Sequence, residues 1–150
     1  MQTVSNPFQA LKDIFIKPNQ VFATIAQTHN WSWIPFIVIC VSSALPLYFY
    51  FNFVDFNWYS EMIIQSSAGD VSPAELDMMR QTFQQSPMLF MSIFSVIIST
   101  LLANAVLAAY LKFASKADEE CVQGFTDWYG FTWWVSMPSV IFNLIALVII

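Results

Sequence analysis

The chain has 150 residues, of which 57% are hydrophobic and only 10% are charged, and its formal net charge is −5. About a quarter of the residues in soluble domains are charged, so this composition excludes an ordinary soluble domain and favours one small membrane domain. The five Lys and Arg residues form no basic stripe, which excludes a nucleic-acid-binding surface. The single histidine, His29, and two distant cysteines lack metal-ligand spacing, so we expect no metal and no cofactor.

Residues 1–30 are predicted to form a cytoplasmic amphipathic segment with two short helices. Asn6 is expected to cap the first helix, with Pro7 at its first position, and Pro18 is expected to start the second helix. Such a pair lies either in the membrane interface or against the protein's own cytoplasmic loop, and both alternatives stay open. The expected apolar faces are Phe8, Leu11 and Phe15 in the first helix and Val21, Phe22 and Ile25 in the second.

Three stretches without any charged residue follow, at 30–54, 81–111 and 128–150. A helix needs roughly 20 apolar residues to cross a hydrocarbon core about 30 Å thick. Backbone amides in lipid must be paired within the segment, so each stretch must be helical. The sequence therefore predicts an all-α polytopic membrane protein. We expect three transmembrane helices at about 31–54, 87–111 and 128–150, within a membrane domain over residues 31–150.

Positive charge near the span ends predicts the orientation. Lys12 and Lys17 precede the first span and Lys112 and Lys116 follow the second, whereas Arg80 is the one such residue between these spans. We expect the amino terminus and the connection 112–127 in the cytoplasm and the connection 55–86 outside. The membrane is expected to be the inner (plasma) membrane of the cell.

The connections carry their own signals. Ser72 and Glu75 flank Pro73 in a capping-box pattern that predicts a helix start in the outer connection. Asp127 is expected to cap the third span and to interact with its amino-terminal dipole. The acidic run 118–120 is expected in a solvated loop.

Small residues mark one face of the second span. Ser92, Ser95, Ser99 and Ala103 recur at spacings of three and four, which is typical of helices that approach each other closely in membranes. A second, weaker small face contains Ala105 and Ala109. The two faces together predict a central position for this helix, and Ser95, Ser99 and Ala103 are candidate packing residues.

No span contains an ionisable side chain, so an intramembrane protease or metal hydrolase lacks its machinery. We therefore expect no catalytic residue and no enzyme activity. Asn104 and Asn143 either bridge helices or line a solute path. Pro46 and Pro138 are the prolines expected to kink spans. The polar residues within the spans are Ser42, Ser43, Asn52, Ser99, Thr100, Asn104, Ser136 and Asn143.

The order of these parts resembles the Yip1 domain family of membrane proteins, in particular its bacterial branch. The resemblance implies a multi-helix bundle without established catalytic residues, usually of about five spans, so we expect that this chain is truncated. The Rab-type GTPase association of eukaryotic members transfers to no residue here. The motifs that carry the resemblance are NPF at 6–8, KPNQVF at 17–22, WSWIPF at 31–36, GFTDWYG at 124–130 and MPS at 137–139.

Two functional hypotheses follow. The first is a non-enzymatic membrane protein that acts through contacts with other membrane proteins, through self-association or by organising the lipid bilayer. The second is a component of a small-solute transporter or channel, because kinked helices and polar groups at the membrane midplane are typical of substrate paths.

Overall fold

A computed structural model describes residues 4, 6–27, 31–67, 69, 72–118 and 121–150. The predictions for His29, Glu119 and Glu120 lie outside these residues. The helices of the described chain are α1 (Pro7–Ile16), α2 (Pro18–Ile25), α3 (Trp33–Phe53), α4 (Phe56–Ser67), α5 (Pro73–Thr82), α6 (Gln85–Ser115), α7 (Phe125–Val135) and α8 (Ser139–Ile149).

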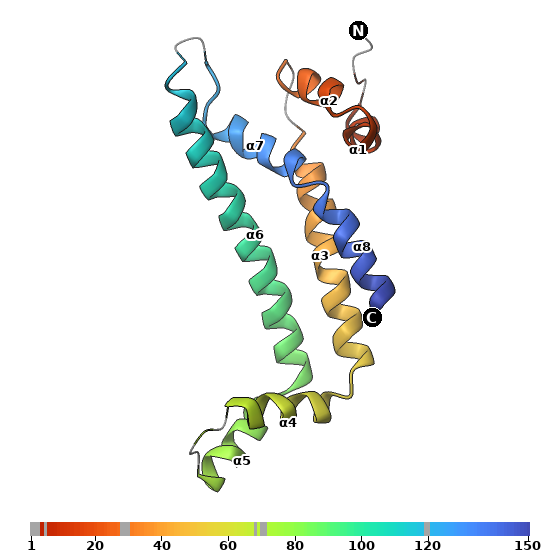
Figure 1. Cartoon of the computed structure of the whole chain (residues 1–150), viewed down its shortest axis with the longest axis vertical. Coiled ribbons are helices and arrows are strands. Elements are labelled where there is room, and N and C mark those ends of the chain that lie inside the picture. Colours follow the sequence, from red (N-terminus) through yellow and green to blue (C-terminus); the bar gives the residue numbers. More distant parts are fainter. Residues whose placement is uncertain (1–3, 5, 28–30, 68, 70–71, 119–120) are drawn as a thin grey trace.

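Two long antiparallel helices, α3 and α6, form the frame of the molecule (Figure 1). At one end α7 crosses obliquely from α6 to α3, and α8 then runs back alongside α3. The helices α1 and α2 lie at this end, and the α4–α5 pair lies at the opposite end.

Within the described residues, three segments are long and apolar enough to span a membrane: Trp33–Phe53, Gln85–Ser115 and Phe125–Ile149. The predicted all-α fold with three spans is thereby confirmed. The second helix extends beyond the predicted 87–111 at both ends, and Pro87 lies in its first turn, where a missing amide is tolerated. The division between residues 1–30 and 31–150 stays a prediction.

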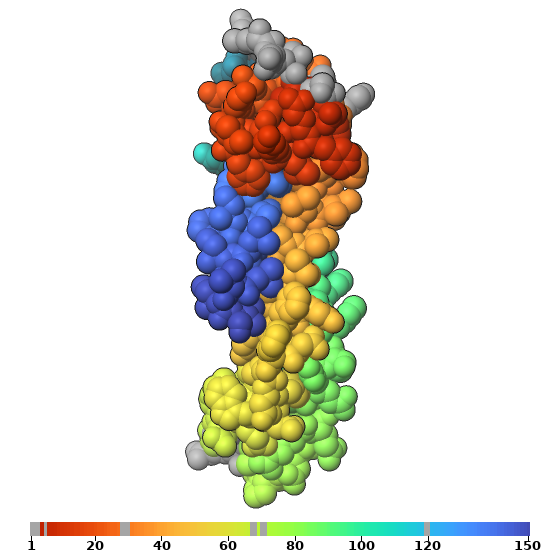
Figure 2. Space-filling model, turned by 90° about the vertical axis from the view of Figure 1, so that its right-hand side faces the viewer, coloured from red at the N-terminus to blue at the C-terminus, as the bar shows by residue number. Residues whose placement is uncertain are grey.

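The third span is not one continuous helix. It breaks between Val135 and Ser139, where the Met137 amide bonds to the Trp134 carbonyl over a tight turn at 3.3 Å. Pro138 has no amide hydrogen to continue the helix. The 11-residue α8 is therefore about 16 Å long, roughly half the hydrocarbon core. Figure 2 shows α8, in dark blue, ending part-way along α3.

The amino-terminal helices begin where predicted. The Asn6 Oδ1 accepts a hydrogen bond from the Gln9 amide at 2.8 Å, and Pro18 opens α2. Phe8 and Phe15 of the predicted apolar face of α1 are 69% and 44% exposed, and the residues that α1 buries in the protein are Ala10 and Ile14. Whether the exposed face lies in the membrane interface stays a prediction.

One hydrophobic core joins the amino-terminal helices to the bundle. Phe22 contacts Phe131 with ring centroids 5.0 Å apart, and Phe36 meets Trp133 edge-on at 5.1 Å. The inner face of α1 and α2 thus packs on the protein itself, while the exposed Phe8 and Phe15 leave an outer apolar face. The buried core residues are Val4, Ala10, Ile14, Val21, Ile25, Ile39, Trp133, Trp134 and Met137.

The opposite end is a short helical pair held by charge. The predicted capping box is confirmed, since the Ser72 hydroxyl accepts from the Glu75 amide and the Glu75 carboxylate accepts from the Ser72 amide. Arg80 donates to both carboxylate oxygens of Glu61, at 2.7 and 3.1 Å. This hydrogen-bonded guanidinium lowers the pKa of Glu61. The helix α4 that carries Glu61 was not predicted, although Asp55 caps it: the Asp55 Oδ1 accepts from the Asn57 and Trp58 amides at 3.0 and 3.3 Å.

The helix α3, rather than α6, occupies the central position. It packs against α1, α6, α7 and α8, whereas α6 packs chiefly against α3 and α7. Asn104 and Ala108 are the buried residues of α6. The prediction that α6 is central is therefore wrong for the described chain, and most of its surface is left for lipid or other helices.

Candidate functional site

A polar pocket lies where α3, α6 and the α7–α8 break meet, and it has a volume of about 430 Å³. Ser43 is near the middle of α3 and Thr100 near the middle of α6, which places the pocket near the centre of both spans. We call it the intramembrane pocket. Its lining residues are Ile39, Ser43, Ser99, Thr100, Ala103, Asn104, Ser136, Ser139 and Asn143.

Asn104 connects α6 to the break in the third span. Its side chain is buried, its Nδ2 donates to the Thr100 carbonyl at 2.9 Å, and its Oδ1 accepts from the Ser136 hydroxyl at 3.2 Å. A hydrogen bond between membrane helices contributes about 0.6–2 kcal/mol. One of these bonds stays within α6, and the bond from Ser136 links α6 to the turn between α7 and α8.

Asn143 makes the corresponding connection between α8 and α3. Its Nδ2 donates to the hydroxyls of Ser42 and Ser43, at 3.1 and 3.0 Å. Pro46 lies one turn further along α3 and has no amide to donate to the Ser42 carbonyl. Pro46 thus weakens the helical hydrogen bonding of α3 beside the point where Asn143 attaches, although α3 continues through it.

Part of the pocket's hydrogen-bonding capacity is unused. Within the residues that the structure describes, the hydroxyls of Ser99 and Ser139 and the Oδ1 of Asn143 have no hydrogen-bond partner. Ser99 is also exposed on the surface of α6. In hydrocarbon such groups have no water to bond with, so the pocket presents polar atoms that favour a polar neighbour.

The structure separates the predicted site residues into two groups. Ser99, Ala103, Asn104 and Asn143 lie together in the pocket. Ser95 is exposed one turn away from Ser99, and Pro138 lies in the turn between Ser136 and Ser139. The small face of α6 is thus exposed rather than packed within this chain, and its role as a packing surface stays a prediction.

Several pocket residues were missed as site candidates. Ser43, Thr100, Ser136 and Ser139 are hydroxyl residues whose convergence depends on helices distant in sequence. The sequence did contain one usable signal, because Ser136 and Ser139 flank Pro138, where a helix break exposes polar groups.

The pocket contains no group suited to acid–base or metal chemistry. None of its lining residues is Asp, Glu, His, Cys or Lys. A search of the described residues finds no cluster of three or more metal-ligating side chains. Hydroxyl and neutral amide groups allow the pocket to bind by hydrogen bonds alone.

Comparison with known proteins identifies one family. The model of the Yip1 domain matches residues 12–150, which includes the second half of α1, all of α2, all three spans and the intramembrane pocket. No curated protein and no solved structure gives a significant match.

Proposed function

We propose, from the premise that this chain belongs to the Yip1 domain family, that it is a non-enzymatic membrane protein that binds other membrane helices. The binding surface is the exposed small-residue face of α6 together with the rim of the intramembrane pocket. The chain's three apolar spans place it in the lipid bilayer, where association depends on close packing and on hydrogen bonds.

The observation that carries this proposal is the polar rim itself. Ser99 and Ala103 are exposed small residues, and they border the unused hydroxyl of Ser139 in the pocket. Small side chains let a second helix approach, and a partner with hydroxyl or amide groups satisfies the polar atoms. Lipid tails do neither, so a helix is the better neighbour for this surface.

Crosslinking in native membranes tests the proposal. In a Cys40→Ala/Cys121→Ala background, single cysteines replace Ser99 or Ala103, and matched controls replace Phe90 or Phe94, which are exposed on the opposite side of α6. A thiol-reactive benzophenone, which crosslinks to neighbouring C–H bonds on illumination, is expected to give a discrete adduct at positions 99 and 103. The controls are expected to give at least about five times less, because tight helix contact is local.

The mass of the adduct identifies the partner. An adduct of twice the monomer mass means self-association, and another discrete mass means a different membrane protein. Equal yields at all four positions, or no adduct at any of them, would contradict the proposal.

The second candidate function is participation in a solute path. The observation that favours it is the broken third span at the centre of the membrane, lined by polar atoms on both sides of Pro138. In this case Asn143→Leu should abolish solute movement in liposomes while the helices still assemble. If the parent protein moves no solute and the Asn143→Leu variant fails to assemble, the result supports the helix-binding function instead.

The orientation belongs to the proposal as well. We place the amino terminus and α1–α2 on the cytoplasmic side of the inner membrane because Lys12, Lys17, Lys112 and Lys116 are at that end. Labelling of single cysteines in α5 from the cytoplasmic side would contradict this orientation.

A further inference from the structure

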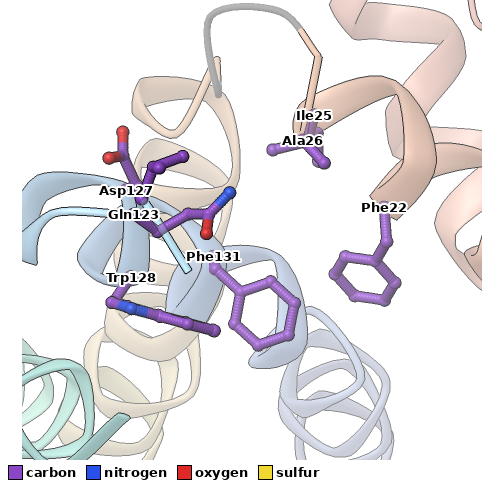
Figure 3. Close-up of a pocket in the computed structure, with 8 residues that line it drawn as sticks. Phe22, Ile25, Ala26, Gln123, Asp127, Trp128 and Phe131 are labelled. Carbon is purple, nitrogen blue, oxygen red and sulfur yellow. The ribbon is translucent and has the colours of Figure 1, made fainter. Parts of the chain in front are cut away.

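A second pocket, of about 550 Å³, lies between α2 and the start of α7. Its volume is within the range of about 300–1,000 Å³ that is typical of small-ligand sites. We call it the interfacial pocket, and Figure 3 shows the residues around it. Its lining residues are Phe22, Ile25, Ala26, Val122, Gln123, Asp127, Trp128 and Phe131.

The interfacial pocket straddles the boundary between polar and apolar parts of the chain. Trp128 and Phe131 belong to the first turns of the third span, whereas Gln123 belongs to the connection that also carries Lys112 and Lys116. Trp rings prefer the headgroup level of a bilayer. The pocket is therefore at the depth of lipid headgroups.

Three aromatic rings form one continuous wall of this pocket. Phe131 contacts Phe22 at 5.0 Å and Trp128 at 5.7 Å between ring centroids. In Figure 3 Phe22 and Phe131 lie side by side at one edge, and the Gln123 amide extends into the space between Trp128 and Ala26. Aromatic faces attract ammonium groups, and Trp does so most strongly.

Two polar features of the wall are unused by the protein. The Asp127 Oδ2 accepts from the Gly124 amide at 2.8 Å, but Asp127 forms no ion pair within the described residues. The buried indole Nε1 of Trp128 has no hydrogen-bond partner within the same residues. A ligand that carries a cation beside an anionic oxygen matches the carboxylate and leaves its oxygen near an indole N–H that has no partner in the described protein.

We propose that the interfacial pocket binds the headgroup of an amine-bearing zwitterionic phospholipid, with its ammonium between Asp127 and the aromatic wall and its phosphate beside Gln123 and Trp128. The bilayer is the source of this ligand, because the pocket is at headgroup depth. Ile25, Ala26 and Val122 provide an apolar surface for the adjoining glycerol and first methylene groups. The bound lipid thereby links α2 to α7.

Native mass spectrometry of the purified full chain tests the proposal. The delipidated protein is incubated with equal amounts of dioleoyl phosphatidylethanolamine and dioleoyl phosphatidylglycerol. The parent protein is expected to bind about five times more of the ethanolamine lipid than of the glycerol lipid. A contact of an ammonium group with an aromatic ring and a carboxylate changes the binding constant by about this factor. Phe22→Leu is expected to reduce this preference, because it removes one ring.

Asp127→Asn is the decisive variant. Asparagine keeps an oxygen for the Gly124 amide, so α7 keeps its first turn while the charge is lost. The preference is expected to fall below about two-fold. Asp118→Asn is the matched control, because Asp118 is at the same end of the molecule but does not line the pocket. Thermal unfolding in detergent checks that each variant is folded.

Three results would overturn the proposal: equal retention of both lipids by the parent protein, an unchanged preference in folded Asp127→Asn, or the same loss in Asp118→Asn. Water-soluble glycerophosphoethanolamine provides the remaining arm. If glycerophosphoethanolamine binds as tightly as the lipid, the ligand does not need to come from the bilayer, and the proposal that the ligand is a membrane lipid fails. These outcomes are independent of whether α6 binds another helix.

Discussion

At the scale of single residues, neutral amides organise the membrane part of this protein. Asn104 and Asn143 each bond to hydroxyl groups on another helical segment, and the residues joined by Asn143 are about a hundred positions apart. A neutral amide offers both donor and acceptor without the desolvation cost of a charge. Asn is therefore well suited to bridge helices at this depth.

We predict that the Asn104–Ser136 bond couples α6 to the third span. Asn104→Leu and Ser136→Ala should each destabilise the protein, and a double-mutant cycle should give a coupling free energy of about 0.6–2 kcal/mol. Unfolding in mixed detergent micelles measures it. Asn52→Leu is the control, because the exposed Asn52 bonds to the Tyr48 carbonyl of its own helix. A coupling near zero would mean that the bond is not made in the membrane.

At the scale of elements, local signals placed the helix starts but not their partners. The caps at Asn6 and Ser72 are contacts over three residues, so the sequence pattern was sufficient to predict them. The face that α1 buries depends on the distant α3 and α7, and it contains Ala10 and Ile14 rather than the bulky Phe8 and Phe15. The position of α4 depended on the aromatic contacts of Tyr59 with Tyr50 and Phe51 at the end of α3.

The α4–α5 pair is predicted to loosen in acid. Arg80 lowers the pKa of Glu61, so this ion pair stabilises the folded pair above the ordinary glutamate pKa of about 4.3 and is lost as the pH falls below it. Distances between spin labels on exposed Met62 and Met78 positions should broaden below about pH 4.

Two variants separate the Glu61–Arg80 contact from a general acid effect. Glu61→Gln should show the broad distribution at neutral pH, and its distribution should change little with pH. Asp55 directly precedes α4, at the end of that helix away from α5. Asp55→Asn removes a charge there and should behave like the parent protein. An identical pH response in Glu61→Gln would contradict the assignment.

At the scale of the whole molecule, one core connects the amino-terminal helices to the spans. Trp133 is 2% exposed and contacts Phe36 and Tyr129 at 5.1 and 5.8 Å between ring centroids. The same core contains Val21 and Ile14 from the amino-terminal helices. The amino-terminal helices are thus held against the bundle by this core.

Trp133→Ala is predicted to destabilise the protein by about 3–5 kcal/mol, the range for large cavities in packed cores. It should also release α1 and α2, so limited trypsin digestion should cut after Lys12 faster than in the parent protein. Trp33→Ala is the matched control, since Trp33 is 56% exposed and near the same end of α3. Equal cleavage rates in the two variants would refute the connection.

The sequence by itself determined the solvent, the helical fold and the three apolar spans, because a charge-free stretch of this length is stable only as a helix in lipid. It also determined the helix caps at Asn6 and Ser72, which are local. The tertiary structure decided which face of α1 is buried, where the third span breaks and which hydroxyls surround Asn104 and Asn143. These features depend on contacts between residues up to about a hundred positions apart, and no local pattern specifies such contacts. The three charge-free stretches thus predicted where the helices lie, and packing between them created the polar pocket at their centre.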